Sequence, residues 1–585
     1  MKTDRRTFLK SPAALAGAAY ALTGCNDTVT SISRGRPNII LIITDDQGYG
    51  DLASHGNEHI RTPNLDRLAA ESTEFKRFYV CPTCAPTRAG LLTGRYHHRT
   101  GIMGVMSGEA LIDPDEVTVA RTLGAGGYRT GIFGKWHQGD NYPRRPIDMG
   151  FDEELVHCGG GLSQPSDPPG VGYHNPAHQE KYNYTIYDNF PHWVSSNNYF
   201  DPVLRHNGVL EQFEGYCTDI FFDAAMDFIE RHRDAPFFVY LPTNAPHSPE
   251  IVSEDYLARY RAMDIDEKTA RCYAMIENID DNIGRLFERL EALGLDEDTI
   301  LIFLGDNGPQ YNRFNSGLRG RKAQFYEGGI RVPFFIRWPG KFEAGAKHDA
   351  VAANIDLCPT ILSACGLDNP YRRNFDGINL LPLLYSVEKS PPDRTLFFQG
   401  NDGVPEKYNQ CAVVTQQWKM VNGKELYDLV DDPGETTDLA GTRADIVADL
   451  RRRYEQWFDD VGSTRGYTPQ RIWIGTKHEN PVVLTPQDWR GPRSRFVRPD
   501  SHGWWEISVM TDGTYEFTVD IDKRPEPEKL VLTFGDIRME ATVPKGKTNH
   551  TFGPMELRKG ESRLETWLEK KGEKLGVKRV SAALM

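Results

Sequence analysis

Three segments of the chain are almost continuously apolar and lack the alternation of a half-exposed strand. Residues 39–43 read Ile-Ile-Leu-Ile-Ile, residues 237–241 read Phe-Phe-Val-Tyr-Leu, and residues 299–304 read Thr-Ile-Leu-Ile-Phe-Leu. Such runs, rich in β-branched residues, are typical of strands that are buried on both faces, as in parallel sheets. The pattern therefore predicts a central sheet that is covered on both sides.

Helical patterns lie between these strands, over residues 62–75, 218–233 and 269–293. Strands that alternate with helices predict an α/β domain with a mainly parallel sheet flanked by helices. In such sheets, polar residues just beyond the strand ends meet in one crevice. Candidate chemistry is therefore expected where the strands end.

The pattern changes after about residue 390. A strand at 427–429 runs into a turn, residues 446–458 have a helical pattern, and short strands dominate beyond residue 465. These strands are expected at 504–510, 514–521, 529–534 and 538–543. Gly and Pro turns separate them, which predicts a β-rich appendage. Its aromatic residues Trp489, Trp504 and Trp505 offer a sugar-binding surface, but packing in a sheet core is the favoured interpretation.

The first 25 residues are predicted to be an export signal. Arg5-Arg6-Thr7-Phe8-Leu9-Lys10 resembles a twin-arginine motif, and Leu22-Thr23-Gly24-Cys25 resembles a lipobox. The apolar stretch between them is too short and too rich in Gly and Ala to span a membrane. We expect a bacterial protein that the export machinery carries to the periplasm or cell surface. Lipid attachment at Cys25 is favoured, with cleavage and release as the alternative.

Composition and charge narrow the function classes. The 585 residues are 39% hydrophobic and 26% charged, with a formal net charge of -14. This charge argues against a nucleic-acid partner, because such proteins neutralise phosphates with Lys and Arg. Any attraction of an anionic substrate must then be local to a pocket. Nine cysteines in this length do not indicate a disulfide scaffold.

Cys84 stands in the sequence Cys84-Ala85-Pro86-Thr87-Arg88. Pro86 suits the first turn of a helix, so Cys84 is predicted at a helix N-terminus, where free N–H groups favour an anion. Arg88 adds a permanent positive charge. Cys81 and Cys84 also form a Cys-x-x-Cys pair, which leaves a redox dithiol as a less favoured alternative, with Cys81 as a core thiol.

Two acidic pairs follow two of the predicted strands. Asp45 and Asp46 come after residues 39–43, and Asp306 and Asn307 come after residues 299–304. Four oxygen donors without His or Cys suit a hard cation, Ca²⁺ or Mg²⁺, rather than zinc. Either pair alone is more often a loop turn or a helix cap. Together, at the ends of two strands of one sheet, they predict a metal site.

The Cys-x-Pro-x-Arg motif and the Thr93-Gly94-Arg95 that follows it resemble the signature of the type I, formylglycine-dependent sulfatases. These are arylsulfatase-like members of the alkaline-phosphatase superfamily. Thr87 stands where the family usually has serine. The resemblance implies that a maturation enzyme oxidises Cys84 to formylglycine. It also implies that Asp45, Asp46, Asp306 and Asn307 bind Ca²⁺, with Mg²⁺ as the other option, beside residue 84, whose side chain is itself a ligand.

The resemblance assigns four further site residues, in the family's order along the chain. Lys135 and His137 lie in Gly134-Lys135-Trp136-His137, and alternation in an extended segment would point both side chains the same way. His247 matches the second family histidine. Lys322 lies five residues before Glu327-Gly328-Gly329 and matches the sulfate-binding lysine, with Arg321 as a competitor. With Cys84 and Arg88, these form the expected catalytic set.

The resemblance also implies an organisation and a substrate class. The expected parts are a signal at 1–25, a tether at 26–35, a catalytic domain at 36–390, a C-terminal subdomain with an antiparallel sheet and a helix at 391–465, and a β-rich extension at 466–585. The expected reaction is hydrolysis of a sulfate ester on a sulfated polysaccharide or oligosaccharide, of the galactan or glycosaminoglycan type. The alternatives are a phosphonate or phosphate ester hydrolase and a non-catalytic, lipid-anchored glycan-binding protein.

The segment from about residue 157 to 215 is predicted to be a large insertion near the substrate. It contains many aromatic residues, namely Tyr173, Tyr182, Tyr184, Tyr187, Trp193 and Tyr199, together with His174 and His192. Early in it, His157, Gln164 and Asp167 are candidates for contacts with sugar hydroxyls. Most of the aromatic residues are expected to pack a long loop.

Overall fold

The computed structural model describes residues 35–164, 167–188, 190–191, 194, 197–371, 373–386, 393–400, 403–468, 470–495, 498 and 500–585. The predicted export signal, the Cys25 anchor and the tether before Gly35 lie outside these residues, as do His192 and Trp193 of the insertion. Residues 36–585 form one compact unit. Among the described residues, no helix combines the length and the apolar character needed to cross a membrane.

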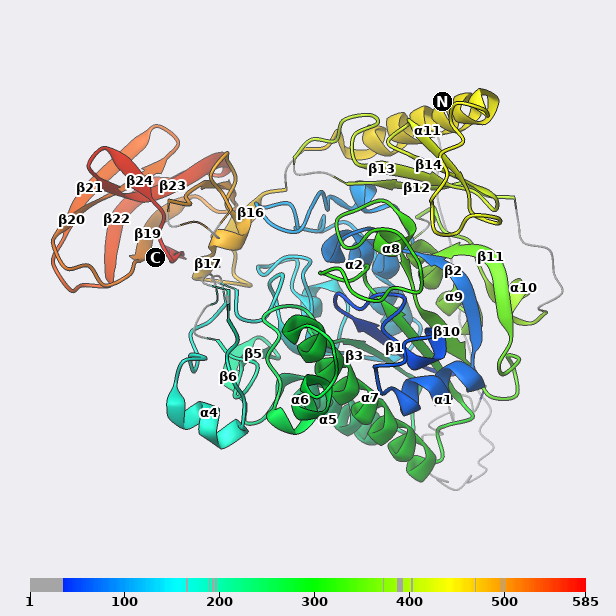
Figure 1. Ribbon diagram of the computed structural model, residues 1–585. Helices are drawn as coiled ribbons and strands as arrows, with labels where there is room; N and C mark the ends of the chain where they lie inside the picture. The colour runs from blue at the N-terminus through cyan, green and yellow to red at the C-terminus, as the bar shows by residue number, and fades with distance from the viewer. Residues whose placement is uncertain are drawn as a thin grey trace, which may run out of the picture. The chain divides into compact units, whose positions relative to one another are not determined.

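An eleven-stranded sheet forms the centre of the first part of the chain (Figure 1). Every pairing is parallel from β8 through β1, β7 and β3 to β4, which confirms the mainly parallel central sheet. Antiparallel strands extend it on both sides. Its strands are β1 (Asn38–Thr44), β2 (Thr73–Tyr79), β3 (Arg129–Lys135), β4 (Glu153–His157), β5 (Val203–His206), β6 (Val209–Gln212), β7 (Phe237–Pro242), β8 (Thr299–Gly305), β9 (Arg331–Val332), β10 (Phe334–Arg337) and β11 (Lys347–Ala353).

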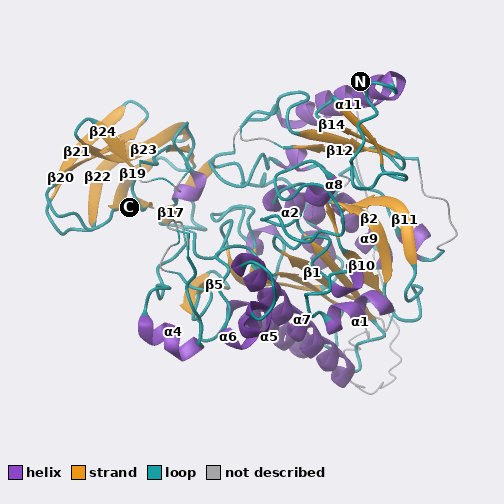
Figure 2. Ribbon diagram, viewed as in Figure 1, coloured by secondary structure: helices purple, strands orange, loops and turns teal. Residues whose placement is uncertain are grey.

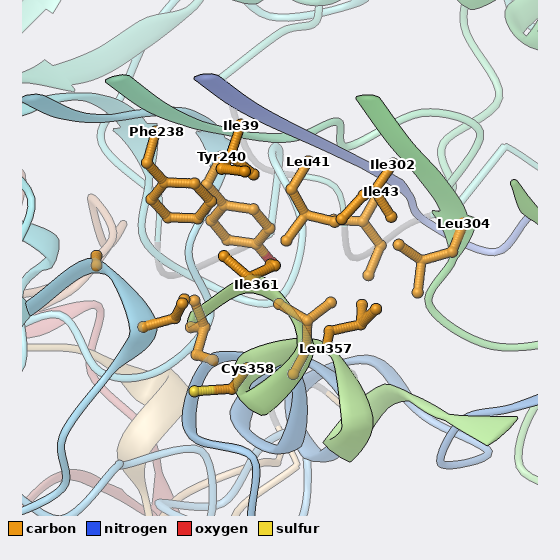
Figure 3. Packing of buried hydrophobic residues seen from close by; sticks show 14 of the residues in the cluster. Ile39, Leu41, Ile43, Phe238, Tyr240, Ile302, Leu304, Leu357, Cys358 and Ile361 are labelled. Atoms are coloured by element: carbon orange, nitrogen blue, oxygen red, sulfur yellow. The ribbon is translucent and has the colours of Figure 1, made fainter. Parts of the chain in front are cut away.

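Helices cover both faces of this sheet (Figure 2). Those of the catalytic region are α1 (Pro63–Glu71), α2 (Cys84–Thr93), α3 (Val119–Ala125), α4 (Pro176–Tyr182), α5 (Cys217–Arg231), α6 (Glu254–Arg261), α7 (Glu267–Leu293), α8 (Glu327–Ile330), α9 (Leu357–Ala364) and α10 (Leu381–Leu384). A buried hydrophobic cluster lies on each face of the sheet, and the side chains of β1 point alternately into one cluster and the other. Ile39, Leu41 and Ile43 pack toward α9 on one face, and Ile40 and Ile42 join the cluster on the other (Figure 3). Each such side chain stabilises the fold by roughly 1.5–3 kcal/mol relative to an exposed position.

One predicted helix is too long. The helix expected over residues 62–75 ends at Glu71, and Ser72 is extended, with φ -107° and ψ 165°. Thr73 then begins β2, whose side chains are almost all buried. The wrong boundary arises because Phe75 lies two helical turns after Leu68, so it continues the apolar spacing of Leu65 and Leu68 although it belongs to β2.

A second, four-stranded antiparallel sheet follows, as predicted for the C-terminal subdomain. Its strands are β12 (Leu396–Gln399), β13 (Cys411–Val414), β14 (Trp418–Val421) and β15 (Glu425–Asp428). Helix α11 (Ala444–Arg465) packs against it through Leu450, Tyr454 and Val461, which share a buried cluster with Val413 and Met420. The helix begins earlier and ends later than the predicted range of 446–458.

The chain ends in two further sheets, which form a β-sandwich around one hydrophobic cluster. One holds β16 (Ile472–Ile474), β18 (Trp504–Val509), β20 (Glu528–Phe534), β21 (Ile537–Val543), β23 (Gly560–Lys570) and β24 (Glu573–Leu575). The other holds β17 (Val482–Leu484), β19 (Gly513–Asp520), β22 (Asn549–Leu557) and β25 (Arg579–Leu584). Trp489 and Trp505 are 3% and 0% exposed, so both belong to the core, while Trp504 is half-buried. The β-rich extension is confirmed.

Candidate active site

The two predicted acidic pairs meet at the carboxyl ends of neighbouring parallel strands. Thr44 of β1 pairs with Gly305 of β8, so Asp45 and Asp46 emerge beside Asp306. The backbone N–H of Asp46 donates to Asp306 Oδ1 at 3.1 Å. All three carboxylates and the Asn307 amide are at most 1% exposed. The crevice expected at the strand ends is therefore present, and its floor is acidic.

Two oxygens in this crevice have no hydrogen-bond partner among the described residues, namely Asp45 Oδ1 and Asn307 Oδ1. The Asn307 amide donates to Asp46 Oδ1 at 2.8 Å, which leaves its own oxygen available. Buried oxygens without a partner are costly and rare. Ligand atoms of Asp45, Cys84 and Asp306 also lie within 4.8 Å of one another. The carboxylate and amide oxygens of this crevice fit a hard cation, which the Cys84 sulfur itself does not.

Three cations balance the three carboxylates, and of these Arg88 and Lys135 are fully buried while the Lys322 side chain is 16% exposed. Lys135 Nζ donates to Asp45 Oδ2 at 2.7 Å, and Lys322 Nζ lies 2.7 Å from Asp46 Oδ1. The Arg88 guanidinium donates to Asp306 Oδ2 from Nε at 3.1 Å and from Nη2 at 2.9 Å. Formal charges therefore cancel within the cluster. A divalent cation would leave it with a net positive charge, which suits an anionic ligand.

The pKa values of two of these carboxyl groups, Asp45 and Asp306, are shifted in opposite directions. Burial tends to raise the pKa of Asp45, but the positive charges of Lys135 and Arg88 outweigh it and hold that pKa below its ordinary value. Burial and the Asp45 charge together raise the pKa of Asp306 to about 7. Crowded acids of this kind repel one another until a further cation is added. This imbalance is the second observation that fits a metal ion.

Cys84 is the first residue of α2, as predicted, with Thr83 in the N-cap position. Thr87 anchors the turn, because its hydroxyl donates to the carbonyl oxygens of Cys81 at 3.1 Å and Thr83 at 3.2 Å. The thiol is 3% exposed. Burial raises the pKa of Cys84 above its ordinary value although Lys135 and Lys322 oppose the shift. An unmodified thiol here is therefore a poor nucleophile.

His137 lies beside Cys84, with Nδ1 3.4 Å from Sγ. Its Nε2 lies 2.8 Å from the Val105 carbonyl oxygen. A carbonyl only accepts, so Nε2 carries the proton and Nδ1 presents its lone pair to residue 84. The predicted extended geometry is wrong here. Strand β3 ends at Lys135 and His137 has φ 58°, so a left-handed turn rather than strand alternation brings its ring to the site.

His247 also lies beside the acidic floor, where its ligand atom is within 4.8 Å of those of Asp45 and Asp46. Its Nε2 is 3.9 Å from Asp46 Oδ2, and its Nδ1 is 2.7 Å from the Ser248 carbonyl oxygen. Burial, helped by the Lys322 charge, lowers the pKa of His247 below its ordinary value. The ring is therefore neutral and exposes an Nε2 lone pair toward the crevice. The predicted site residues are thus all brought together.

The geometry also bears on two alternatives, which are Arg321 in place of Lys322 and a redox dithiol formed by Cys81 and Cys84. Arg321 points away, because its Nη1 donates to the Gln310 carbonyl oxygen at 3.2 Å, so Lys322 is the cation at the site. Cys81 and Cys84 are both free thiols. Cys81 is buried, and burial raises its pKa to about 12, which does not suit a redox dithiol.

A family model described as Sulfatase matches residues 37–367, and these include the crevice and its predicted residues. The chain belongs to the sulfatase family. It is a sulfuric ester hydrolase of the alkaline-phosphatase superfamily, as the Cys84 motif predicted. A second model, described as N-sulphoglucosamine sulphohydrolase, C-terminal, matches residues 321–459. Membership implies in general a metal ion and a formylglycine.

The relatives of this sulfatase include human and bacterial enzymes. Human arylsulfatase A is 30% identical over 465 residues, which are 74% of this chain and 85% of that protein. The N-acetylgalactosamine-6-O-sulfatase of Bacteroides thetaiotaomicron is 29% identical over 518 residues, 74% of this chain and 96% of that protein. The crystal structure of Ps i-CgsB in complex with k-i-k-neocarrahexaose has a TM-score of 0.63 at 28% identity, covering 76% of this chain and 96% of that chain.

The insertion of this sulfatase covers both histidines. A Cβ atom at Gly160 would lie 2.9 Å from His137 Nε2, and one at Gly161 would lie 3.2 Å from His247 Cε1. His157, at the end of β4, is paired in register with Lys135, and neither of its ring nitrogens has a hydrogen-bond partner among the described residues. Tyr173, Tyr184, Tyr187 and Tyr199 are buried, so they pack the insertion as expected.

Sequence reasoning missed a contact between this site and the C-terminal extension. Gln487 Nε2 donates to the Val105 carbonyl oxygen at 2.7 Å, the same oxygen that lies against His137 Nε2. The Gln487 carbonyl accepts from Gly108 N at 3.2 Å, and Arg490 Nη1 donates to the Gly108 carbonyl at 2.9 Å. The extension therefore holds the loop that orients His137.

Proposed function

We propose that this sulfatase hydrolyses sulfate esters on a sulfated polysaccharide or oligosaccharide, with Cys84 in its formylglycine form and Ca²⁺ at the acidic floor. The observation that carries the proposal is the convergence of two unpartnered oxygens, three cations and a neutral histidine around the residue 84 side chain. The Ca²⁺ ligands would be Asp45, Asp46, Asp306, Asn307 and the modified residue 84.

The two absent groups fit the residues that surround them. The hydrate of formylglycine at residue 84 would supply a geminal diol, one hydroxyl of which is an oxygen nucleophile. Ca²⁺ would add positive charge where the sulfate oxygens lie. Oxygen ligands without soft donors favour Ca²⁺ or Mg²⁺, and we propose Ca²⁺ because it accepts six to eight oxygens in a flexible geometry, whereas Mg²⁺ requires a nearly ideal octahedron.

The chain's own residues bind the anion and move its protons. Lys135 and Lys322 are the cations nearest the floor, and they neutralise the charge that would otherwise repel a nucleophile. His137 Nδ1, 3.4 Å from the residue 84 side chain, is placed to accept a proton from it. Lys322, next to Asp46, carries a proton that it can give to the leaving alcohol, and His247 is the alternative acid once its neutral ring has taken up a proton at Nε2. Arg88 holds Asp306 and so fixes the floor.

The carbohydrate substrate is proposed from the relatives and from the chain's expected export. Human N-acetylgalactosamine-6-sulfatase is 33% identical over 386 residues, 63% of this chain and 69% of that protein. The Ps i-CgsB structure holds a neocarrahexaose. We therefore place the substrate among sulfated galactans or glycosaminoglycans outside a bacterial cell, reached by a periplasmic or surface protein anchored at Cys25.

A phosphonate or phosphate ester hydrolase is the second candidate. The phosphonate monoester hydrolase of Agrobacterium radiobacter has the same fold, with a TM-score of 0.52 at 21% identity. The two reactions are separated by comparing turnover of an aryl sulfate with that of an aryl phosphonate. A preference for the phosphonate would overturn the sulfatase assignment of the substrate. Loss of both activities with retained binding of a sulfated glycan would favour the non-catalytic alternative.

The formylglycine is tested on the protein produced with and without a maturation enzyme. We expect mass spectrometry to find formylglycine at residue 84 only in the active preparation, and the Cys84→Ala variant to lose turnover. The matched control is Cys81→Ser, which should keep both the modification and the activity. Full activity with an intact Cys84 thiol would contradict the proposal.

A further inference from the structure

A cleft with four arginines lies between the C-terminal extension and the loop that orients His137. It has a volume of about 480 Å³, and its lining includes Arg490, Arg493, Arg495 and Arg498 from the extension. Ser107 and Glu109 of the loop form the facing wall. Among the described residues that line it, the four arginines face the carboxylates of Glu109 and Asp500, which gives this lining a net positive charge in a chain whose formal net charge is -14.

The arginines differ in how they are held. Arg490 is half-buried and donates to the Gly108 carbonyl, so it fixes the wall of the cleft. Arg493 is 56% exposed and lies 3.2 Å from Asp500, which is itself 48% exposed. Arg495 and Arg498 are exposed as well. Exposed ion pairs contribute little to stability, so folding does not explain this concentration of charge.

The cleft adjoins the catalytic crevice. Its wall starts at Ser107, two residues after Val105, and two residues span at most about 7 Å. The Val105 carbonyl lies 2.8 Å from His137 Nε2, and the Ser494 hydroxyl donates to Ser107 Oγ at 2.8 Å. One loop therefore separates residue 84 from the arginines. An oligosaccharide of a few units is long enough to occupy both places.

We propose that this cleft is a second anion subsite, which binds a sulfate or carboxylate group on a sugar neighbouring the one that is desulfated. Guanidinium groups recognise such anions through paired N–H donors. The subsite belongs to the extension, which lies beyond both matched family segments, the later of which ends at residue 459. The inference rests on the proposed sulfatase activity on glycans and assigns the extension a part in choosing polyanionic substrates.

The test compares two double variants of the full, matured chain. Arg493→Ala with Arg498→Ala changes the cleft, and Arg538→Ala with Arg558→Ala removes the same charge from exposed positions on or beside β21 and β22. The readout is the ratio of kcat/KM for a sulfated carrageenan hexasaccharide to kcat/KM for p-nitrophenyl sulfate. We expect the cleft variant to lower this ratio about three- to tenfold, through KM for the hexasaccharide. The control variant should leave it unchanged.

An equal ratio in the cleft variant and the control would overturn the subsite. A parallel fall of both activities, with the ratio unchanged, would also overturn it and give the arginines a structural role. If the wild type turns over neither substrate, the proposed sulfatase activity is contradicted, and the subsite has to be tested separately. The subsite is then judged by calorimetric binding of the hexasaccharide to the Cys84→Ala chain with and without the cleft substitutions.

A competition arm identifies the anion. Unsulfated oligogalacturonate carries only carboxylates, and the carrageenan hexasaccharide carries only sulfates. Inhibition of hexasaccharide turnover by oligogalacturonate in the wild type, but not in the cleft variant, assigns a site for anionic sugars in general. Binding of the hexasaccharide alone assigns a sulfate site. Equal binding of either probe to wild type and cleft variant would contradict the proposal.

Discussion

The catalytic crevice and the arginine cleft both gather positive side chains, but they use them differently. In the crevice, Arg88 and Lys135 are 0% exposed and each is bonded to a buried carboxylate. In the cleft, Arg493 is 56% exposed and its partner is nearly as exposed. Buried pairs fix the positions of charges and are hardly screened by salt, whereas exposed charges attract from a distance and are screened. The fixed charges of the crevice therefore suit catalysis, and the exposed charges of the cleft suit the binding of an anionic substrate from solution.

The largest effect should come from breaking a buried pair. We expect Arg88→Met to leave the Asp306 charge without its partner, which costs about 3–5 kcal/mol and abolishes turnover. Thermal unfolding and aryl sulfate turnover measure the two effects. Adding Asp306→Asn should restore part of the stability but none of the activity. An Arg88→Met protein that melts like Arg493→Met would show that the pair is not the structural feature described here.

Removal of the metal should have the next largest effect. Chelation with EGTA is expected to abolish turnover and lower the melting temperature, because ligand binding at 100 times Kd stabilises the folded state by about 2.7 kcal/mol. Added Ca²⁺ should restore both properties better than Mg²⁺. The Asp306→Asn variant should melt at the same temperature with and without EGTA. Full activity in EGTA would exclude Ca²⁺ as the required ion.

The loop between the two regions gives a smaller effect. Gln487→Leu removes the donor to the Val105 carbonyl and so loosens the partner of His137, although it touches no substrate. We expect kcat to fall about tenfold with little change in KM for the aryl sulfate. The pH dependence of kcat should shift with it. Thr518→Val, which removes an exposed hydroxyl pair with Thr551 in the same extension, is the control and should change neither.

The smallest effect on stability should come from the cleft itself. Arg493→Met is expected to change stability by no more than about 0.5 kcal/mol, as is usual for exposed sites. It should nevertheless flatten the rise of KM for a sulfated oligosaccharide as salt is added, since the Debye length is only about 8 Å at physiological ionic strength. Steady-state kinetics over a range of NaCl concentrations measure this slope. If KM for the Arg493→Met variant rises with salt as steeply as KM for the wild type, the cleft does not attract the substrate through exposed charge, and the described difference between cleft and crevice is wrong.

The catalytic crevice was predictable because its information is local. Continuous apolar runs at 39–43 and 299–304 predicted buried parallel strands, and the residues that follow them meet in the folded chain. Lys322 and His247 needed the family resemblance, since nothing near them in the sequence marks them as site residues. The same locality explains the error at residues 72–75, where Phe75 of a buried strand continues the apolar spacing of the helix before it.

Features that depend on distant parts of the chain were not predictable. Gln487 and Val105 are 382 positions apart, and no periodicity links them. The turn that places His137, with φ 58°, follows a strand whose alternation predicted an extended backbone. The arginine cleft likewise brings Ser107 and Glu109 together with arginines that lie more than 380 positions later in the chain, from Arg490 onward. Tertiary packing decides such contacts, so sequence patterns alone leave them open.

The two glycines over the histidines restrict how this enzyme can change. At Gly160 the smallest side chain would lie 2.9 Å from a ring nitrogen of His137, and at Gly161 it would lie 3.2 Å from the ring of His247. Any larger residue at Gly160 would therefore move His137, and one at Gly161 would crowd His247, whatever sugar is being selected for. Adaptation to new polymers is therefore expected at residues farther from the two histidines, while Gly160 and Gly161 are retained.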